Sequence, residues 1–532
     1  MDGPKGDEPL PQHMEPQQDF TSHTIAMRAA LEHCVGELKF LLGDDILGED
    51  PNEDGGIRHR LDRWSQEVSS RHQLSEEARN ALAPALLTKE RRKRALDIFL
   101  GKWKNEEPES VPIDVVKIVR GECANGGKDG GDGNIEIELS SLDFKQRYVY
   151  GNIPAIVRDL GEEEGPFFPL ASKWNKDSVK EWFLRNVGSD TMVPVKKPAS
   201  STRDETLDDD GRAIECDEVE MSMKDWIDYC QSSNGATRPK EKPLYLKDWH
   251  LVQFLEGKGV SQALDDSPLY SVPTVFSRDI LNPFLLRFIG GDFRFCYWGP
   301  AGSYTALHSD VLHTFSWSFN VIGEKKWTFY PPTVGSDKSD GETNLLRSFV
   351  LTQKEGDAIF VPSGWKHEVV NVIETISVNH NWCTAASVDR VWECITVEIA
   401  AVEKEADAWK LPKEDWASRE NMLRGCIGLD VTAFFFALLV SLLDDLAWFG
   451  GESCGEDDDS ERYFDSFHLT RQLLVMMDND AATMGAYNCD HSLSKRLSAI
   501  LSSEHRAHEA LLVAKKASQA FSVLFESQSI FQ

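Results

Sequence analysis

Thr305-Ala306-Leu307-His308-Ser309-Asp310 is the hexapeptide on which the interpretation of this 532-residue chain rests. It lies between about Ser141 and Asn381, where short apolar runs rich in Val, Ile, Phe and Tyr alternate with Gly, Pro and Asp turns. Such runs predict an all-β barrel or sandwich. Because side chains alternate along a strand, His308 and Asp310 are expected on the same face, with Thr305 close by.

A second histidine, His367, begins another predicted strand in the run DAIFVPSGWKHEVVN. Two histidines and one carboxylate can bind one face of an octahedral ion and leave three positions open, as in non-haem Fe(II) oxygenases. His308, Asp310 and His367 are therefore the predicted metal ligands and catalytic residues. The His-x-acid pattern alone is weak, since this composition gives about two matches by chance. The chain has two, and the other, His13-Met14-Glu15, lies in a polar leader with no strand around it.

A lysine in the apolar run Gly323–Pro332 makes the metal prediction more specific. Lysine is rarely buried unless an anion pairs with it. The distal carboxylate of 2-oxoglutarate would be such an anion. Either Lys325 or Lys326 could bind it, because alternation sends the two to opposite faces.

Further motifs are Pro243–His250, Gly299–Asp310, Phe315–Asn320, Gly323–Trp327, Val361–His367 and Ser377–Trp382. Together they resemble a JmjC domain of the cupin superfamily, and the resemblance covers roughly 141–445. Within that family they are most similar to a subgroup of lysyl hydroxylases that act on translation release factor one. The resemblance implies a mainly β, double-stranded β-helix (jelly-roll) core flanked by N- and C-terminal α-helical regions.

The resemblance also assigns roles to individual residues. It makes Lys325, rather than Lys326, the 2-oxoglutarate lysine, with Thr305 and Tyr245 adding hydroxyls to the same carboxylate. Asn381 and Asn379 fall on the strand after His367, near the iron-bound end. For Tyr245, Thr305 and Asn379 the alternative is ordinary barrel packing or strand pairing. The iron ligands that it implies are His308, Asp310 and His367.

The activity implied by the resemblance is oxidation of a protein side chain with Fe(II), 2-oxoglutarate as co-substrate and O₂. Its implied target is a lysine of release factor one. One alternative is a histone N-methyl-lysine demethylase, although the sequence shows no Cys/His cluster with zinc-ligand spacing. Another is a non-catalytic cupin-like binding scaffold, which would not need the three ligands and Lys325.

Outside the β region the chain has helical periodicity. The run Val431–Leu443 is short of the ~20 residues that span a bilayer, so a buried helix is expected. The C-terminal helices could also form a homodimer. The predicted organisation is a disordered leader (1–20), a helical N-terminal extension (21–120), a Gly/Asp-rich linker (121–138), the JmjC oxygenase domain (139–388) and a helical C-terminal region (389–532).

The formal net charge is −31, with a pI near 4.9. Such a surface repels phosphate backbones and anionic membranes, so neither nucleic acid nor membrane is an expected partner, whereas a basic protein would be attracted. The ten cysteines include no C-x-x-C pair, which is typical of reduced intracellular thiols. A cytoplasmic location is therefore expected. The basic run 89–94 is either a nuclear signal or a solvated helix face.

Overall fold

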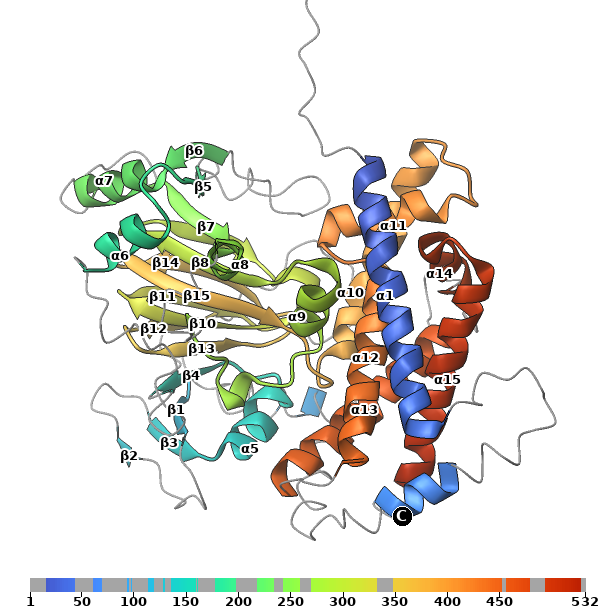
Figure 1. Cartoon of the computed structure of the whole chain (residues 1–532). Coiled ribbons are helices and arrows are strands. Elements are labelled where there is room, and N and C mark those ends of the chain that lie inside the picture. Colours follow the sequence, from blue (N-terminus) through green and yellow to red (C-terminus); the bar gives the residue numbers. More distant parts are fainter. Residues whose placement is uncertain are drawn as a thin grey trace, which may run out of the picture.

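The computed structural model places a β-barrel beside a bundle of helices (Figure 1). The residues that it describes are 16–43, 61–68, 93–94, 97, 113–118, 128–129, 135–158, 160, 178–197, 218–233, 243–258, 269–332, 348–451, 456–478 and 493–527.

Two sheets form the barrel, as the predicted double-stranded β-helix requires. Neighbouring strands pair antiparallel, apart from β1, which is parallel to both β3 and β4. The larger sheet runs in the order β2 (Lys128–Asp129), β3 (Ile135–Leu139), β1 (Val115–Ile118), β4 (Ala155–Arg158), β13 (Ala358–Val361), β10 (Phe315–Ile322), β15 (Thr375–Trp382), β8 (Arg294–Gly299), β7 (Tyr245–Trp249), β5 (Met192–Lys196), β6 (Glu218–Ser222). The smaller sheet runs in the order β12 (Phe349–Gln353), β11 (Lys325–Tyr330), β14 (Lys366–Asn371), β9 (Tyr304–His308).

Strand β10 shows why the barrel interior is polar. Its sequence FSWSFNVI is buried along its whole length, and its aromatic and small polar residues alternate. Trp317 stacks on Phe276, with ring centroids 5.6 Å apart, on the outer face. Ser316 and Ser318 point the other way, where they donate hydrogen bonds to Asp310 and Asn379. The pleat thus buries aromatic rings outside and lines the inside with hydroxyls.

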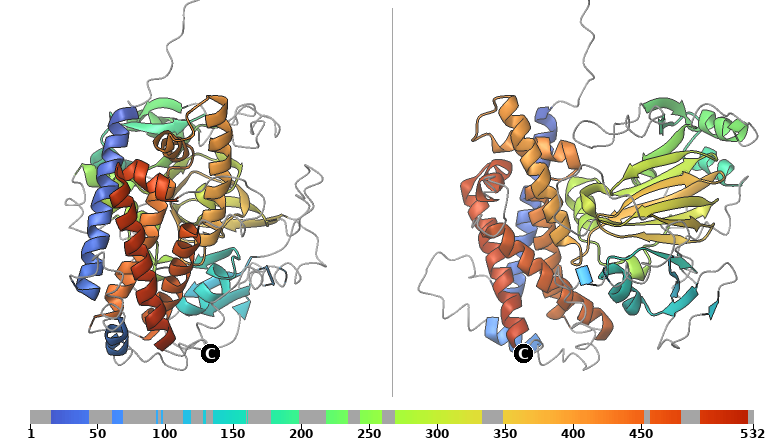
Figure 2. Two further views of the ribbon diagram at one scale, coloured as in Figure 1. Left: turned by 90° about the vertical axis from the view of Figure 1, so that its right-hand side faces the viewer. Right: turned by 180° about the vertical axis from the view of Figure 1, so that it is seen from behind.

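The helices gather mainly beside the barrel, where α1 packs against α12, α14 and α15, and α10, α11 and α13 complete the bundle (Figure 2). The long helices are α1 (Pro16–Leu42), α10 (Val388–Ala408), α11 (Trp416–Ile427), α12 (Val431–Phe449), α13 (Glu456–Met477), α14 (Leu493–Leu501) and α15 (Glu504–Ser527). Shorter helices are α5 (Ser141–Phe144), α6 (Ser178–Asn186), α7 (Met223–Ser233), α8 (Leu251–Gly257), α9 (Leu281–Phe284), η2 (Lys145–Val149), η5 (Thr274–Phe276), η6 (Leu285–Ile289) and η7 (Val311–His313).

Helix α12 is the core of the bundle. By length and composition it could cross a membrane, but 78% of its apolar window is buried inside the protein, as in the core helix of a globular domain. This agrees with the buried helix predicted for the run 431–443. The Asp430 side chain caps its N-terminus by accepting a hydrogen bond from Ala433 N. His23 of α1 lies 2.6 Å from the same carboxylate, so the first described helix is tied to the start of α12.

Buried ion pairs join the barrel to the bundle. Arg278, which precedes α9, donates to Asp445 of α12 at 2.7 Å and to Asp465 of α13 at 2.6 Å. Lys145, at the start of η2, donates to Glu461 of α13 at 2.7 Å. These buried charges fix the position of the barrel relative to the bundle, because breaking one pair leaves the remaining charge buried without a partner.

Three segments differ from the predicted organisation. Helix α1 begins at Pro16, inside the predicted leader 1–20. Strands β2 and β3 fall in the predicted linker 121–138, and β1 falls in the predicted helical extension 21–120. The Gly/Asp-rich composition of this segment indicated a linker, although the short run IEIEL has the alternation of a strand and forms β3. Residues 1–15 and most of the basic run 89–94 lie outside the described residues.

Candidate metal centre

His308, Asp310 and His367 converge on the inner face of the smaller sheet. Strands β9 and β14 pair with His308 directly opposite His367, and Asp310 follows β9. The ligand atoms that the three residues offer all lie within 4.8 Å of one another. The two imidazole centroids are 4.3 Å apart. Two imidazoles and one carboxylate on one side of an ion form the donor set of a facial triad.

A bulge in β9 shapes this cluster. Thr305 pairs with Val369 and His308 with His367, so β9 uses three residues where β14 uses two. The extra residue brings Thr305 to the same side as His308, which strict alternation would not do. Thr305 thereby lies on the same side of the sheet as the three clustered side chains.

Both histidines are oriented by backbone carbonyls. His308 Nδ1 lies 2.8 Å from Ala306 O, and His367 Nδ1 lies 3.3 Å from Trp365 O. A proton on Nδ1 that is shared with a carbonyl leaves Nε2 as the free ligand atom. Burial and the neighbouring His308 lower the pKa of His367 to about 4, which keeps this imidazole neutral. Neutral imidazole is the form that binds metals.

The residue that orients Asp310 was not identified from the sequence motifs. Ser316 Oγ donates a 2.8 Å hydrogen bond to Asp310 Oδ2, and Ser316 is 4% exposed. With one oxygen held, the other is left to bind an ion. Register pairs Ser316 with Asn381, whose Nδ2 donates to Thr314 Oγ1 at 3.2 Å. The predicted Asn381 therefore supports the strand ends around Asp310.

Lys325 is buried in the barrel, whereas Lys326 is exposed. Its Nζ donates to Ser377 Oγ at 2.6 Å and lies 5.5 Å from the centre of the Tyr297 ring. It forms no ion pair with a carboxylate in the part of the chain that the structure describes. Burial without an anion lowers the pKa of Lys325 to about 7. A buried ammonium of this kind matches an incoming carboxylate.

The remaining predicted residues line the same interior. Asn379 Oδ1 accepts hydrogen bonds from Ser318 at 3.1 Å and from Ser377 at 3.2 Å, so it is linked through Ser377 to Lys325. Tyr245 of β7 is buried, and burial raises its pKa, so its hydroxyl stays neutral. The Tyr245 and Tyr297 ring centroids are 6.0 Å apart. Ser377 and Tyr297 are further residues of the site, to which the family resemblance assigned no role.

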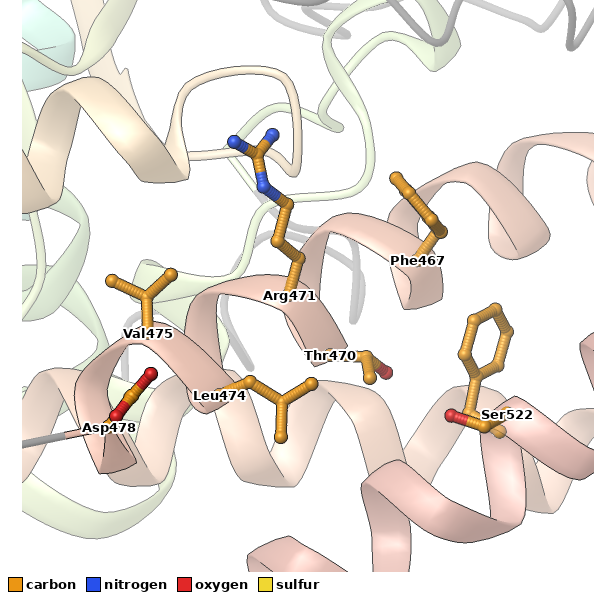
Figure 3. A pocket seen from close by; sticks show the side chains of 8 residues that line it. Phe467, Thr470, Arg471, Leu474, Val475, Asp478 and Ser522 are labelled. Atoms are coloured by element: carbon orange, nitrogen blue, oxygen red, sulfur yellow. The ribbon is translucent and has the colours of Figure 1, made fainter. Parts of the chain in front are cut away.

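A pocket of about 410 Å³ lies elsewhere, between α13 and α15 (Figure 3). Half of its lining residues are apolar and half are polar: Phe467, Leu474, Val475 and Phe521, and Thr470, Arg471, Asp478 and Ser522. Among the described residues, the only group of three or more His, Cys, Asp or Glu that could hold a metal is the cluster in the barrel. The barrel interior, and not this pocket, therefore carries the candidate chemistry.

Known proteins match the region that holds the cluster. Residues 141–339 match the cupin-like domain, and residues 335–382 match the JmjC domain, hydroxylase. The 2-oxoglutarate and iron-dependent oxygenase JMJD4 of Danio rerio is 33% identical over 56% of this chain and 72% of its own length. The Gallus gallus protein of that name is 35% identical over 42% of this chain, and the match spans 55% of its length. The arginine-specific demethylase JMJ20 of Arabidopsis thaliana is 29% identical over 56% of this chain and 67% of its own length.

The match to the zebrafish protein spans most of that relative, and the cupin-like and JmjC matches together contain the two sheets' central strands and all three clustered side chains. The barrel and the similarity both agree with the predicted JmjC domain. The chain belongs to the JMJD4 family of JmjC-domain proteins.

Proposed function

We propose that this chain is an Fe(II)- and 2-oxoglutarate-dependent oxygenase that hydroxylates a lysine side chain of translation release factor one. The observation that carries the oxygenase assignment is the pairing of the triad with Lys325. A buried lysine that no described carboxylate neutralises lies in the same barrel as an open three-ligand cluster. The names of the JMJD4 relatives, which specify iron and 2-oxoglutarate, support the same reading.

The residues present fit both groups. His308, Asp310 and His367 would hold Fe(II) and leave positions for a chelating co-substrate and O₂. Lys325, assisted by the hydroxyls of Thr305 and Tyr245, would hold the distal carboxylate of 2-oxoglutarate. When bound, iron with 2-oxoglutarate and O₂ supplies an oxidant that turns a C–H bond into an alcohol and releases succinate and CO₂.

The chain's own residues orient the reactants and keep water out. Ser316 fixes the carboxylate of Asp310, and the backbone carbonyls fix the two imidazoles. Rings cover the His367 side of the cluster: the centroid of Trp327 lies 5.5 Å, and that of Phe329 5.6 Å, from that of His367. No general base is needed, so the protein's task is positioning and protection of the oxidant.

The choice of a lysine in release factor one rests on the motif-level resemblance to the lysyl hydroxylase subgroup. The acidic surface is suited to a basic protein substrate. A second candidate is N-demethylation, because JMJ20 is named an arginine-specific demethylase and the same oxidant can attack an N-methyl group. For the hydroxylase we propose a cytoplasmic location, where release factors act.

Mass spectrometry of reacted peptides tests the proposal. Purified protein with Fe(II), ascorbate and 2-oxoglutarate would be offered unmodified and methylated peptides tiled along release factor one. A gain of one oxygen on a lysine is expected. Loss of a methylene unit would favour demethylation, and absence of turnover on intact release factor one as well would favour the binding scaffold. His308→Ala should abolish turnover while the protein stays folded; unchanged turnover would contradict the metal assignment.

A further inference from the structure

Strand β7 contains a strained bulge at the side of the barrel that carries Tyr297. Leu246 pairs with Trp298 and Trp249 with Cys296, so β7 advances three residues while β8 advances two. Asp248 is the residue in the left-handed region, with φ +59°. A residue with a Cβ adopts this conformation only where its surroundings enforce it, and bulges commonly redirect a side chain next to an active site.

The redirected carboxylate is coupled to the oxygenase site through Tyr297. Tyr297 Oη donates a 2.8 Å hydrogen bond to Asp248 Oδ1. The other side of that tyrosine is the co-substrate pocket, because Tyr297 lies opposite Ser377 in register and its ring is 5.5 Å from Lys325 Nζ. Burial raises the pKa of Tyr297, and Asp248 and Asp310 both add to that shift. The phenol thus lies within the electrostatic reach of a metal ligand and of Asp248.

Asp248 is held firmly on one oxygen and loosely on the other. Lys196 Nζ and Lys247 Nζ lie 3.6 Å and 3.7 Å from Asp248 Oδ2, which is longer than a hydrogen bond. The Asp248 side chain is 38% exposed. Exposed ion pairs of this length contribute little, so another cation can replace them readily.

We propose that Asp248 is the residue that selects a cationic substrate side chain, by binding its charged head group at the rim of the pocket. The inference rests on the proposed function, which it extends by naming the residue that binds the charged end of the substrate side chain. The four-carbon stem of a lysine separates its ammonium from its backbone. Anchoring the ammonium at Asp248 would fix the C–H bonds of that stem relative to the metal cluster.

Paramagnetic relaxation provides a test that does not depend on turnover. The protein would be loaded with Mn(II) and 2-oxoglutarate without O₂, and relaxation of the methylene protons of n-butylammonium and of 1-butanol would be measured. In the wild type, n-butylammonium should bind near the metal about tenfold more tightly than 1-butanol, since charged hydrogen bonds are the stronger ones. Asp248→Asn keeps an oxygen that can accept from Tyr297 and should abolish that preference.

Glu218→Gln is the matched control, because Glu218 also contacts Lys196, at 3.4 Å, yet is 66% exposed and makes no described contact with Tyr297. This variant should keep the preference. A preference that survives in Asp248→Asn, or that is missing from the wild type, would overturn the inference even if lysine hydroxylation is observed. An Asp248-dependent preference in a protein that oxidises no release-factor peptide would instead contradict the proposed function alone.

Discussion

Ser316 is the residue whose removal should weaken the metal centre without disturbing the ligands themselves. Its hydroxyl holds Asp310 Oδ2, so that the carboxylate offers one oxygen to the ion. Loss of a hydrogen bond that orients a ligand typically weakens metal binding by about 10- to 100-fold. Ser316→Ala should therefore raise the Kd for Fe(II) by about tenfold, measured by anaerobic titration, with an unchanged circular dichroism spectrum.

Ser318→Ala is the control for this prediction. Ser318 lies on the same face of β10 but donates to Asn379 instead of Asp310. Its removal should leave the Kd for Fe(II) within about twofold of the wild type. Equal weakening by both substitutions would mean that β10 packing, and not the contact to Asp310, determines metal affinity.

Lys325 makes co-substrate binding dependent on pH. Burial lowers its pKa from 10.5 to about 7, so the empty pocket holds an ammonium below pH 7 and a neutral amine above it. Because a carboxylate needs the ammonium, the Kd for 2-oxoglutarate should rise by up to about tenfold per unit above pH 7. Calorimetry in buffers of different ionisation enthalpy should show proton uptake at pH 8.

Lys325→Arg separates charge from shape, because a guanidinium stays protonated throughout this range. Its binding of 2-oxoglutarate, even if weaker, should not vary between pH 7 and pH 9. The folding stability of the empty wild type has the opposite pH dependence to its binding of 2-oxoglutarate. Its unfolded chain retains the proton up to about pH 10.5, so this group makes folding more favourable as pH rises from 7. A Kd for 2-oxoglutarate that is flat in the wild type would contradict the role of Lys325.

At the scale of elements, the cap of α12 should contribute more than an ordinary cap. Asp430 accepts from Ala433 N and is fully buried between His23 and Arg424. Burial opposes its ionisation, but these two partners outweigh burial and lower the pKa of Asp430 to about 2. Asp430→Ala should cost about 3 kcal/mol of apparent unfolding free energy, since it leaves the side chains of His23 and Arg424 at this junction without their acceptor.

Asp415→Ala provides the comparison, because Asp415 caps α11 through Ser418 N at a less buried position. Loss of such a cap costs about 1 kcal/mol. Urea titrations followed by circular dichroism would measure both variants. Similar losses would show that the contacts to α1 and Arg424 add nothing beyond capping.

The sequence could predict those features that depend on residues close together in the chain. The β region was predictable because alternation and turns lie within a few residues, as in FSWSFNVI. The contacts of Ser316 and Ser377 were not, because they depend on pairing between distant strands. The position of Thr305 could not be predicted for the same reason. Strict alternation would put Thr305 and His308 on opposite faces of the sheet, and only the bulge in β9 brings them to the same face.

At the scale of the whole molecule, Arg278 should determine how firmly the barrel is attached to the bundle. It contacts Asp445 and Asp465, and Asp445 retains Arg462 at 2.9 Å when Arg278 is lost. Asp465 has no such substitute among its described ion pairs. Arg278→Met should therefore destabilise the protein by about 3 kcal/mol and speed limited proteolysis between the two parts.

Arg147→Met serves as the reference, because Arg147 pairs with Asp114 at 3.0 Å while its side chain is 42% exposed. Exposed pairs contribute at most about 1 kcal/mol. Thermal unfolding and digestion time courses of the two variants would be compared with the wild type. Wild-type digestion of Arg278→Met would mean that apolar packing alone joins barrel and bundle.

The packing of α1 against α12 has a consequence for how the chain is made. The ribosome releases α1 first, but about 390 residues must follow before α12 begins. At about 5–20 residues per second, synthesis of the residues between α1 and α12 takes roughly 20–80 s. Met27, Leu31 and Leu38, buried in the finished protein, are exposed to chaperones throughout that interval. The barrel is therefore synthesised in full before α12, against which α1 packs, has begun.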